Sequence, residues 1–564
     1  MTARGLLLLP LVLAACAGGE TMNGTAADAG KGFGFDAGSD DTCTGEGCKS
    51  PCLTAAESHS SVGCEYWAVD MDGEYGASNG CFVAFVANTA DVPAHLDVSF
   101  AEESIDVARY AKIPRGKGRA ITYEDFDATK GLPPGEVAIV FLAGLPEAGT
   151  PEPGTWKKSV PCPVAPARST LAQRHGTGIG QGFHVRTDVP VVAYQMLPYG
   201  GGSAAVTGAT LLLPTSAWDT NYVAVNAYAT NKDSYSATTS MDIVAAEDGT
   251  VVTLLPKVDV VAGGGLPGGK AGAPMEFKLD KGQVLQLTQP QELTGSPVQS
   301  NKPIGLYAGQ PCLNVPIGMN YCDHAEQQIP PIRALGNEYV AVSHRPRTSR
   351  PENPPFRLIG AVDGTALTWD PAGTGPSTLG AGEILEITTG GRPFVVKSQD
   401  AEHPFVLTTY MTGSSTIETP ATQGYGDADF LRLVPVPQYL DKYVFFTDPT
   451  YPETNLVLTR KAKADGSFAD VDLDCLGVVK TWAPVGSGSL YQYAYVDLSR
   501  HDFQPQNGCD NGRHVMKSAS PFGLSVWGWG TTETKTFTRD VSYAYPAGEN
   551  LAPLNTVVVP ARPK

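Results

Sequence analysis

Two stretches of the 564-residue chain carry residue types that could do chemistry. Asp323-His324, beside Cys322, could supply a general base or a metal ligand, because imidazole titrates near neutral pH. No nucleophile lies close in sequence, so a histidine hydrogen-bonded beneath a disulfide loop is the favoured interpretation. Residues 70–74, Asp-Met-Asp-Gly-Glu, resemble the start of a calcium-binding loop. The twelve-residue pattern with its closing glutamate is missing, so a solvated turn is expected there.

Three further patterns imitate functional motifs. Residues 76–80 fit the G-x-S-x-G string, but a nucleophile elbow needs a following helix, and the apolar run after it predicts a strand behind a polar loop. Residues 176–182 are glycine-rich without the spacing or lysine of a phosphate-binding loop, which predicts a flexible loop. Trp527 and Trp529 alternate as in carbohydrate binders, and equally as in a half-buried strand. These patterns predict a non-enzymatic protein without cofactor or metal.

The amino terminus predicts lipid attachment at Cys16. Arg4 precedes an apolar run over residues 5–13, which is too short to span about 30 Å of hydrocarbon and is typical of a signal peptide. Residues 13–16, Leu-Ala-Ala-Cys, resemble the bacterial lipobox, whose cysteine is acylated after cleavage just before it. The alternative is an ordinary secretory signal cut near Ala15. The residue after the cysteine is not aspartate, which favours an outer-membrane lipoprotein at the cell surface, with the periplasmic face as the alternative.

The remaining ten of the 11 cysteines fit an exported chain. An even number in an oxidising compartment predicts disulfides. Proximity predicts Cys312–Cys322 and Cys475–Cys509, each contributing roughly 2–4 kcal/mol. The other six pair among themselves in an order that the sequence does not fix: Cys43, Cys48, Cys52, Cys64, Cys81 and Cys162. A zinc knuckle is the alternative, disfavoured because the chain has no C-x-x-C pair.

Composition and patterning predict an all-β protein. A hydrophobic content of 42% and a charged content of 17% are typical of a folded chain, and the length suits several domains. Short apolar runs such as residues 137–142 and 251–255 alternate with turns, with 63 Gly and 45 Pro as punctuation. The net charge of −18 argues against nucleic acid as a partner, since that affinity comes largely from Lys and Arg.

Internal repeats divide the chain. Residues 213–225, 330–342 and 434–446 each place a proline eight residues before a tyrosine that opens a strand. A second element, a proline followed by an apolar run, closes each unit; its prolines are Pro190, Pro303, Pro404 and Pro521. Four closing elements imply four units of about 100–117 residues.

A unit of this length holds roughly seven strands, which suits a two-layer sandwich. We therefore expect tandem β-sandwich-like units, with a closed β-toroid or propeller-like arrangement as the alternative. The expected organisation is a signal peptide over residues 1–15, a flexible lipid-anchored tether over 16–50, and β units over 51–200, 201–312, 313–420 and 421–564.

Residues 322–331, Cys-Asp-His-Ala-Glu-Gln-Gln-Ile-Pro-Pro, followed by Tyr339-Val340, carry a family resemblance. They are similar to the N-terminal domain of the IgGFc-binding protein family, whose pattern reads Cys-Asp-His, two variable residues, Glu-Gln, one apolar residue and Pro. Gln327 here takes the usual Glu position. Stretches at 212–214, 295–298 and 445–451 also match bacterial members, and the similarity covers roughly residues 64–560. The resemblance implies a non-catalytic binding or structural module.

The expected function is therefore that of a non-catalytic cell-envelope lipoprotein. Its expected partners are the membrane, through the lipid on Cys16, and an unknown protein or glycan bound by a surface recognition or adhesion module. The alternatives are an envelope-structural or assembly scaffold and, less favoured, a hydrolase whose residues come from distant loops. No binding residue can be named from the sequence.

Overall fold

The structure is a computed structural model that describes residues 50–145, 160–170, 172–230, 238–319, 321–417, 419 and 424–562. Residues 43–564 form one compact unit. Cys16, the predicted tether, Cys43 and Cys48 lie outside the described residues. Within the described ranges, no helix has the length and apolar character needed to cross a bilayer. The α-helices are α1 (Pro51–Ser58) and α2 (Val107–Tyr110), and short 3-10 turns are η1 (Gly118–Ala120), η2 (Gly201–Ser203), η3 (Thr215–Ala217), η4 (Ile332–Ala334), η5 (Ser414–Thr416) and η6 (Val436–Gln438).

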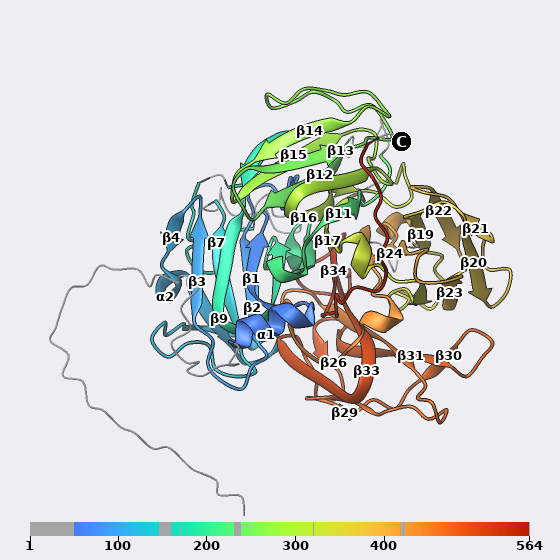
Figure 1. The fold of residues 1–564 in the computed structure, drawn as a ribbon. Helices are drawn as coiled ribbons and strands as arrows, with labels where there is room; N and C mark the ends of the chain where they lie inside the picture. Colours follow the sequence, from blue (N-terminus) through green and yellow to red (C-terminus); the bar gives the residue numbers. More distant parts are fainter. Residues whose placement is uncertain are drawn as a thin grey trace, which may run out of the picture. The chain divides into compact units, whose positions relative to one another are not determined.

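The strands form antiparallel sheets in four groups, which we call the first to fourth repeats (Figure 1). The first repeat contains β1 (Val62–Ala68), β2 (Phe82–Asn88), β3 (Leu96–Phe100), β4 (Glu103–Ile105), β5 (Ala111–Arg115), β6 (Thr122–Asp125), β7 (Val137–Ala143), β9 (Phe183–Leu197) and β10 (Gly208–Leu212). The second contains β8 (Gly178–Gln181), β11 (Asp219–Val223), β12 (Thr239–Ala245), β13 (Thr250–Leu254), β14 (Met275–Leu279), β15 (Gln283–Gln289), β16 (Pro297–Leu313) and β17 (Asp323–Ile329).

The third repeat has two four-stranded sheets. One contains β18 (Glu338–Ala341), β20 (Thr365–Asp370), β21 (Thr378–Leu379) and β23 (Phe394–Ser398), and the other β19 (Pro355–Gly360), β22 (Ile384–Thr388), β24 (Phe405–Met411) and β25 (Asp429–Arg432). The fourth repeat contains β26 (Leu440–Phe446), β27 (Glu453–Lys461), β28 (Val471–Leu473), β29 (Gly477–Val478), β30 (Ala483–Val485), β31 (Tyr491–Arg500), β32 (Gln504–Pro505), β33 (Arg513–Trp529) and β34 (Ser542–Pro546). The prediction of an all-β class is confirmed.

A long strand organises three of the four repeats. β9, β16 and β33 pair through their first halves with one set of strands and through their second halves with another, so each sheet curls around its own core. In β16, Gln299 pairs with Asn221 of β11, and Tyr307 pairs with Asp242 of β12. In the third repeat, two separate strands, β23 and β24, take the place of the single long strand, and each belongs to its own smaller sheet.

A buried tyrosine fixes the same corner in every repeat. The four tyrosine hydroxyls each donate to the carbonyl oxygen of the residue that follows a closing proline. The tyrosines are Tyr66, Tyr222, Tyr339 and Tyr443, and the acceptors, in the same order, belong to Val191, Ile304, Phe405 and Phe522. The two repeated sequence elements therefore contact each other, because a buried hydroxyl needs a partner.

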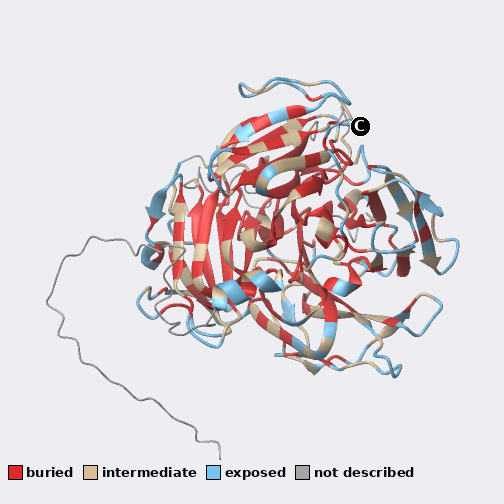
Figure 2. Cartoon of the chain, viewed as in Figure 1, coloured by how far each residue is buried: buried red, intermediate tan, exposed pale blue. Residues whose placement is uncertain are grey.

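The last strand of each repeat lies at the centre. These inner strands are β10, β17, β25 and β34, and their neighbours run in a cycle: β10 contacts β17, β17 contacts β25, β25 contacts β34 and β34 returns to β10. The four repeats therefore surround a common centre, and burial is densest there while the rim loops are exposed (Figure 2). The repeats follow one another as tandem units of curled antiparallel sheets, as expected, and their inner strands are neighbours in a cycle. The expected unit boundaries stay predictions.

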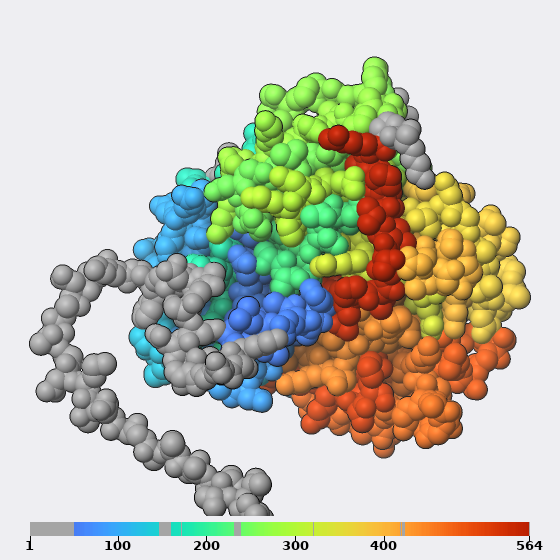
Figure 3. Space-filling view, in the orientation of Figure 1, coloured from blue at the N-terminus to red at the C-terminus, as the bar shows by residue number. Residues whose placement is uncertain are grey.

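The C-terminal segment, residues 547–562, crosses three repeats, and we call it the C-terminal strap (Figure 3). Leu551 donates its N–H to the carbonyl of His59, and Leu554 does so to Arg333 in the third repeat. Further along, the N–H of Val559 donates to the side-chain oxygen of Asn221 in the second repeat at 2.8 Å. The strap thus ties the beginning of the folded chain to its middle.

Candidate functional site

Asp323, from the family-like motif, joins the first, second and fourth repeats. It opens β17, and its carboxylate accepts the backbone N–H of Thr207, just before β10, and that of Ser542 in β34, the latter at 2.5 Å. Burial raises the pKa of Asp323, reinforced by Asp427 and Asp429, while the two backbone donors oppose the shift. Its side chain is fully buried, so this carboxylate acts as a cross-link between repeats.

Gln327 and Gln328 continue the cross-linking. The Gln327 amide nitrogen donates to the carbonyl of Ala209 in β10 at 3.2 Å and to that of Ala544 in β34 at 3.0 Å. An ionised glutamate at this position would have no proton to donate to these two carbonyl oxygens. This is a physical reason for the glutamine found here at a position where the family pattern has Glu. The Gln328 side chain accepts the Leu213 N–H at 2.6 Å.

The third repeat is attached through an arginine. Arg432 of β25 donates from Nε to the carbonyl of Gln328 at 2.6 Å, and its two terminal nitrogens contact both carboxylate oxygens of Glu549. Both side chains are almost fully buried. The motif on β17 therefore reaches the other three repeats, and we call this set of contacts the polar seam.

His324 and Glu326 lie side by side within the seam. Nε2 of His324 is 3.8 Å from Oε2 of Glu326, and both side chains have no exposed surface. Glu326 accepts a hydrogen bond from the amide of Gln195 at 2.7 Å. Because neither group can be reached from solvent, the pair cannot act on a substrate in this conformation. His324 is buried two residues from the Cys312–Cys322 disulfide, but the prediction that it is hydrogen-bonded is wrong: among the described residues, neither ring nitrogen has a hydrogen-bond partner.

Buried aspartates surround the seam, and we call five of them the seam aspartates: Asp70, Asp242, Asp323, Asp427 and Asp429. Burial raises the pKa of each of them. The prediction of a solvated turn over residues 70–74 is wrong. Asp70 and Asp72 are buried, and Asp72 accepts hydrogen bonds from His175 and from the N–H of Gly176.

The structure also shows where three other sequence patterns lie. Residues 76–80 form a turn before β2, as predicted. The prediction of a flexible loop over residues 176–182 is wrong, because Gly178–Gln181 is β8, whose backbone pairs with β15 without needing side chains. Trp527 and Trp529 are completely buried on β33, so they offer no surface for a sugar.

Four disulfides lie within the described residues. They join Cys52 to Cys64, Cys81 to Cys162, Cys312 to Cys322 and Cys475 to Cys509. The two pairs chosen by proximity are therefore present. The pairing of Cys81 with Cys162 spans 81 residues and could not be read from the sequence.

Two clusters in the described part of the chain bring three potential metal ligands together. In the first, Asp474 and His514 stand beside Cys475, whose sulfur is committed to a disulfide and cannot ligate as a thiolate. In the second, Glu453 lies near His501, but its carboxylate is already paired with Arg345 at 2.5 Å. Neither cluster supplies a free set of ligands.

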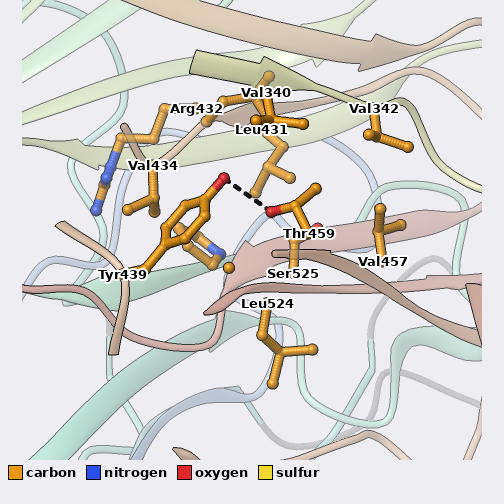
Figure 4. A pocket seen from close by; sticks show the side chains of 13 residues that line it. Val340, Val342, Leu431, Arg432, Val434, Tyr439, Val457, Thr459, Leu524 and Ser525 are labelled. Carbon is orange, nitrogen blue, oxygen red and sulfur yellow. Dashed lines mark hydrogen bonds between the residues drawn. The ribbon is translucent and has the colours of Figure 1, made fainter. Parts of the chain in front are cut away.

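A small cavity lies between the third and fourth repeats (Figure 4). It is lined mostly by apolar side chains such as Val340, Leu431 and Val457, and a hydrogen bond of 2.8 Å joins Thr459 to Tyr439 at its wall. Its volume of about 30 Å³ is enough for water but not for a ligand.

A larger cleft opens where the first and fourth repeats meet, and we call it the basic cleft. Its volume is about 410 Å³, within the range of ligand sites. Its lining residues are Pro114, Arg115, Gly116, Lys117, Glu136, Asp474 and Arg513. Sequence reasoning missed this site, although Arg-Gly-Lys-Gly-Arg over residues 115–119 is a basic cluster in an acidic chain.

Comparison with known proteins identifies the family. A family model described as IgGFc binding protein matches residues 208–528. The human IgGFc-binding protein is 26% identical over 321 residues, which make up 57% of this chain and 5% of the human protein. The chain thus spans a small fraction of that relative's length, and no solved structure gives a significant match. Because the family model covers more than half of the chain, this protein belongs to the IgGFc-binding protein family.

Proposed function

We propose that this protein is a non-catalytic recognition module of the bacterial cell envelope, anchored by a lipid on Cys16 and binding a protein or a glycan. Membership of a family named for binding supports the recognition role. The signal-like run before Cys16 supports the anchor. In this proposal the module serves in adhesion at the cell surface.

The observation that carries the proposal is the polar seam. Buried hydrogen bonds from β17 reach the three other repeats, so the rim loops project from a frame whose parts are fixed relative to one another. A preorganised surface loses little conformational entropy on binding. Such a frame suits recognition, and the exposed loops at its rim provide the surface (Figure 2).

An array of proteins and glycans, with immunoglobulin Fc among the proteins, tests the recognition role. We expect the full chain to bind at least one class saturably, and heat-denatured protein to bind none. Absence of binding to every probe would contradict recognition and favour an envelope-structural role.

Cys16→Ser tests the anchor. We expect the wild-type chain in the outer-membrane fraction, accessible to protease on whole cells, and the variant released from the membrane. A variant that stays in the membrane would contradict lipid anchoring. Protection of the wild-type chain from external protease would place the module on the periplasmic side.

A further inference from the structure

The basic cleft combines a lysine that has no partner among the described residues with carboxylates that already have partners. Arg115 contacts Glu136 at 3.0 Å and Glu124 at 2.5 Å, and Arg513 lies 3.9 Å from Glu136. Asp474 pairs with His514 at 3.1 Å, and hydrogen bonding to that imidazole helps to lower the pKa of Asp474 against the effect of its burial.

Lys117 supplies a positive charge that is not paired within the described part of the protein. It is exposed at the cleft, and within the described residues its ammonium group makes no hydrogen bond or ion pair. Asp510 is near enough to Lys117 to feel its charge, but it lies against the neighbouring Gly118 rather than in the cleft lining. The cleft lining thus carries three basic and two acidic side chains, on a chain whose net charge is −18.

The cleft wall has a fixed shape. Gly116 and Gly118 have φ of +90° and +53°, a region that favours glycine. A Cβ at Gly118 would lie 2.1 Å from the Asp510 carboxylate, and the Gly118 N–H donates to the carbonyl of Asn511 at 2.7 Å. The 116–118 loop of the first repeat is therefore held against the fourth repeat.

On the opposite side, Arg513 is also fixed. Its guanidinium donates to the carbonyl of Gly135 at 2.9 Å, which bridges the two repeats. The preceding Gly512 exchanges hydrogen bonds with Thr447. The Arg513 guanidinium and the backbone that carries Lys117 are therefore positioned before any ligand arrives, which lowers the entropy cost of binding.

We propose that the basic cleft binds an acidic sugar residue, which deepens and rests on the proposed recognition function. Lys117 and Arg513 pair with the sugar carboxylate, and Glu136 and Asp474 accept hydrogen bonds from its hydroxyl groups. The scarcity of apolar side chains in the lining argues against an apolar ligand. A volume of about 410 Å³ accommodates one or two sugar rings.

Binding of glucuronic acid and glucose to the full chain tests this inference, because the two sugars differ by the carboxylate. By ligand-observed NMR titration, we expect glucuronic acid to bind at least tenfold more tightly than glucose and more weakly at high salt. Lys117→Glu should weaken glucuronic acid binding at least tenfold. Lys278→Glu is the matched control, since it makes the same charge change on exposed β14, and should leave binding unchanged.

Equal binding of the two sugars, no binding of glucuronic acid, or equal loss in both variants would overturn the acidic-sugar site. Unchanged thermal unfolding of Lys117→Glu verifies that the variant is folded. If the array finds a ligand whose binding Lys117→Glu does not alter and glucuronic acid does not bind, the cleft inference fails while recognition stands. If no array probe binds but glucuronic acid does, the cleft stands and the adhesion proposal fails.

Discussion

Arg432→Met should leave a buried charge without a partner. Arg432 and Glu549 side chains are 2% and 1% exposed, so neither can be solvated by water. The guanidinium contacts both Glu549 oxygens and also donates to the carbonyl of Gln328. The substitution therefore removes an ion pair and one hydrogen bond from the polar seam at once.

The expected loss follows from these contacts. Removing one member of a buried ion pair costs about 3–5 kcal/mol, and the unpaired carbonyl adds about 1 kcal/mol. Unfolding entropy is about 2 cal/mol/K per residue, so over residues 43–564 this loss lowers Tm by about 4–5 °C if the unit unfolds cooperatively. Adding Glu549→Gln removes the unpaired charge and should recover about half of the loss.

Calorimetry and urea unfolding measure both quantities. Arg562→Met is the matched control, because Arg562 also pairs with a glutamate, Glu276, but with side chains 70% and 53% exposed. Exposed pairs contribute about 0–1 kcal/mol, so this variant should unfold almost as the wild type does. The reasoning is refuted if Arg432→Met matches the control, or if the double variant is no more stable than Arg432→Met.

Three further predictions concern the same frame. Replacing Cys81 and Cys162 by serine should lower the free energy of unfolding by about 4–5 kcal/mol, because their disulfide closes an 81-residue separation; an unchanged urea midpoint would contradict this. The seam aspartates have pKa values raised by burial, so their stabilisation is complete below the unfolded-state pKa of about 3.9 and is lost as pH rises toward the folded-state values. Burial lowers the pKa of His344 to about 4, so this histidine titrates between about pH 4 and its ordinary value of 6.5 and does not contribute above that value. Between pH 6.5 and 8, Tm should therefore fall as the pH rises. A rise of Tm in this range would refute the assignment of raised pKa values to the seam aspartates. Gln327→Glu should destabilise by about 2–4 kcal/mol through two unpaired carbonyls and a buried acid, more at pH 8 than at pH 5, as thermal unfolding can show.

The repeated elements predicted the fold because they carry the same physical contact. One element places a proline eight residues before a tyrosine, and the other places a proline before an apolar run. In the structure, the tyrosine hydroxyl of the first element donates a hydrogen bond to the backbone carbonyl that follows the proline of the second. The copy in the first repeat escaped detection. Its tyrosine, Tyr66, has no proline eight residues earlier, and only the hydrogen bond to Val191 reveals it.

The seam and the cleft could not be predicted from local patterns. Asp70 looks like a solvated turn residue in the sequence, because the groups that act on it lie far away along the chain: Gln173 donates a hydrogen bond to its carboxylate, and the charge of Glu326 raises its pKa. β8 has no strand-like side-chain pattern, since its pairing uses backbone groups alone. Lys117 and Arg513 face the same cleft only because the first and last repeats are neighbours in the cycle.

The C-terminal strap has a consequence for synthesis. Its contacts with His59, Arg333 and Asn221 can form only after residues 547–562 have been synthesised. Until then, the surfaces of the first three repeats that the strap covers are exposed to water or to chaperones. A chain that ends before residue 547 lacks these contacts, so proteases should cleave it more readily than a chain that contains the strap.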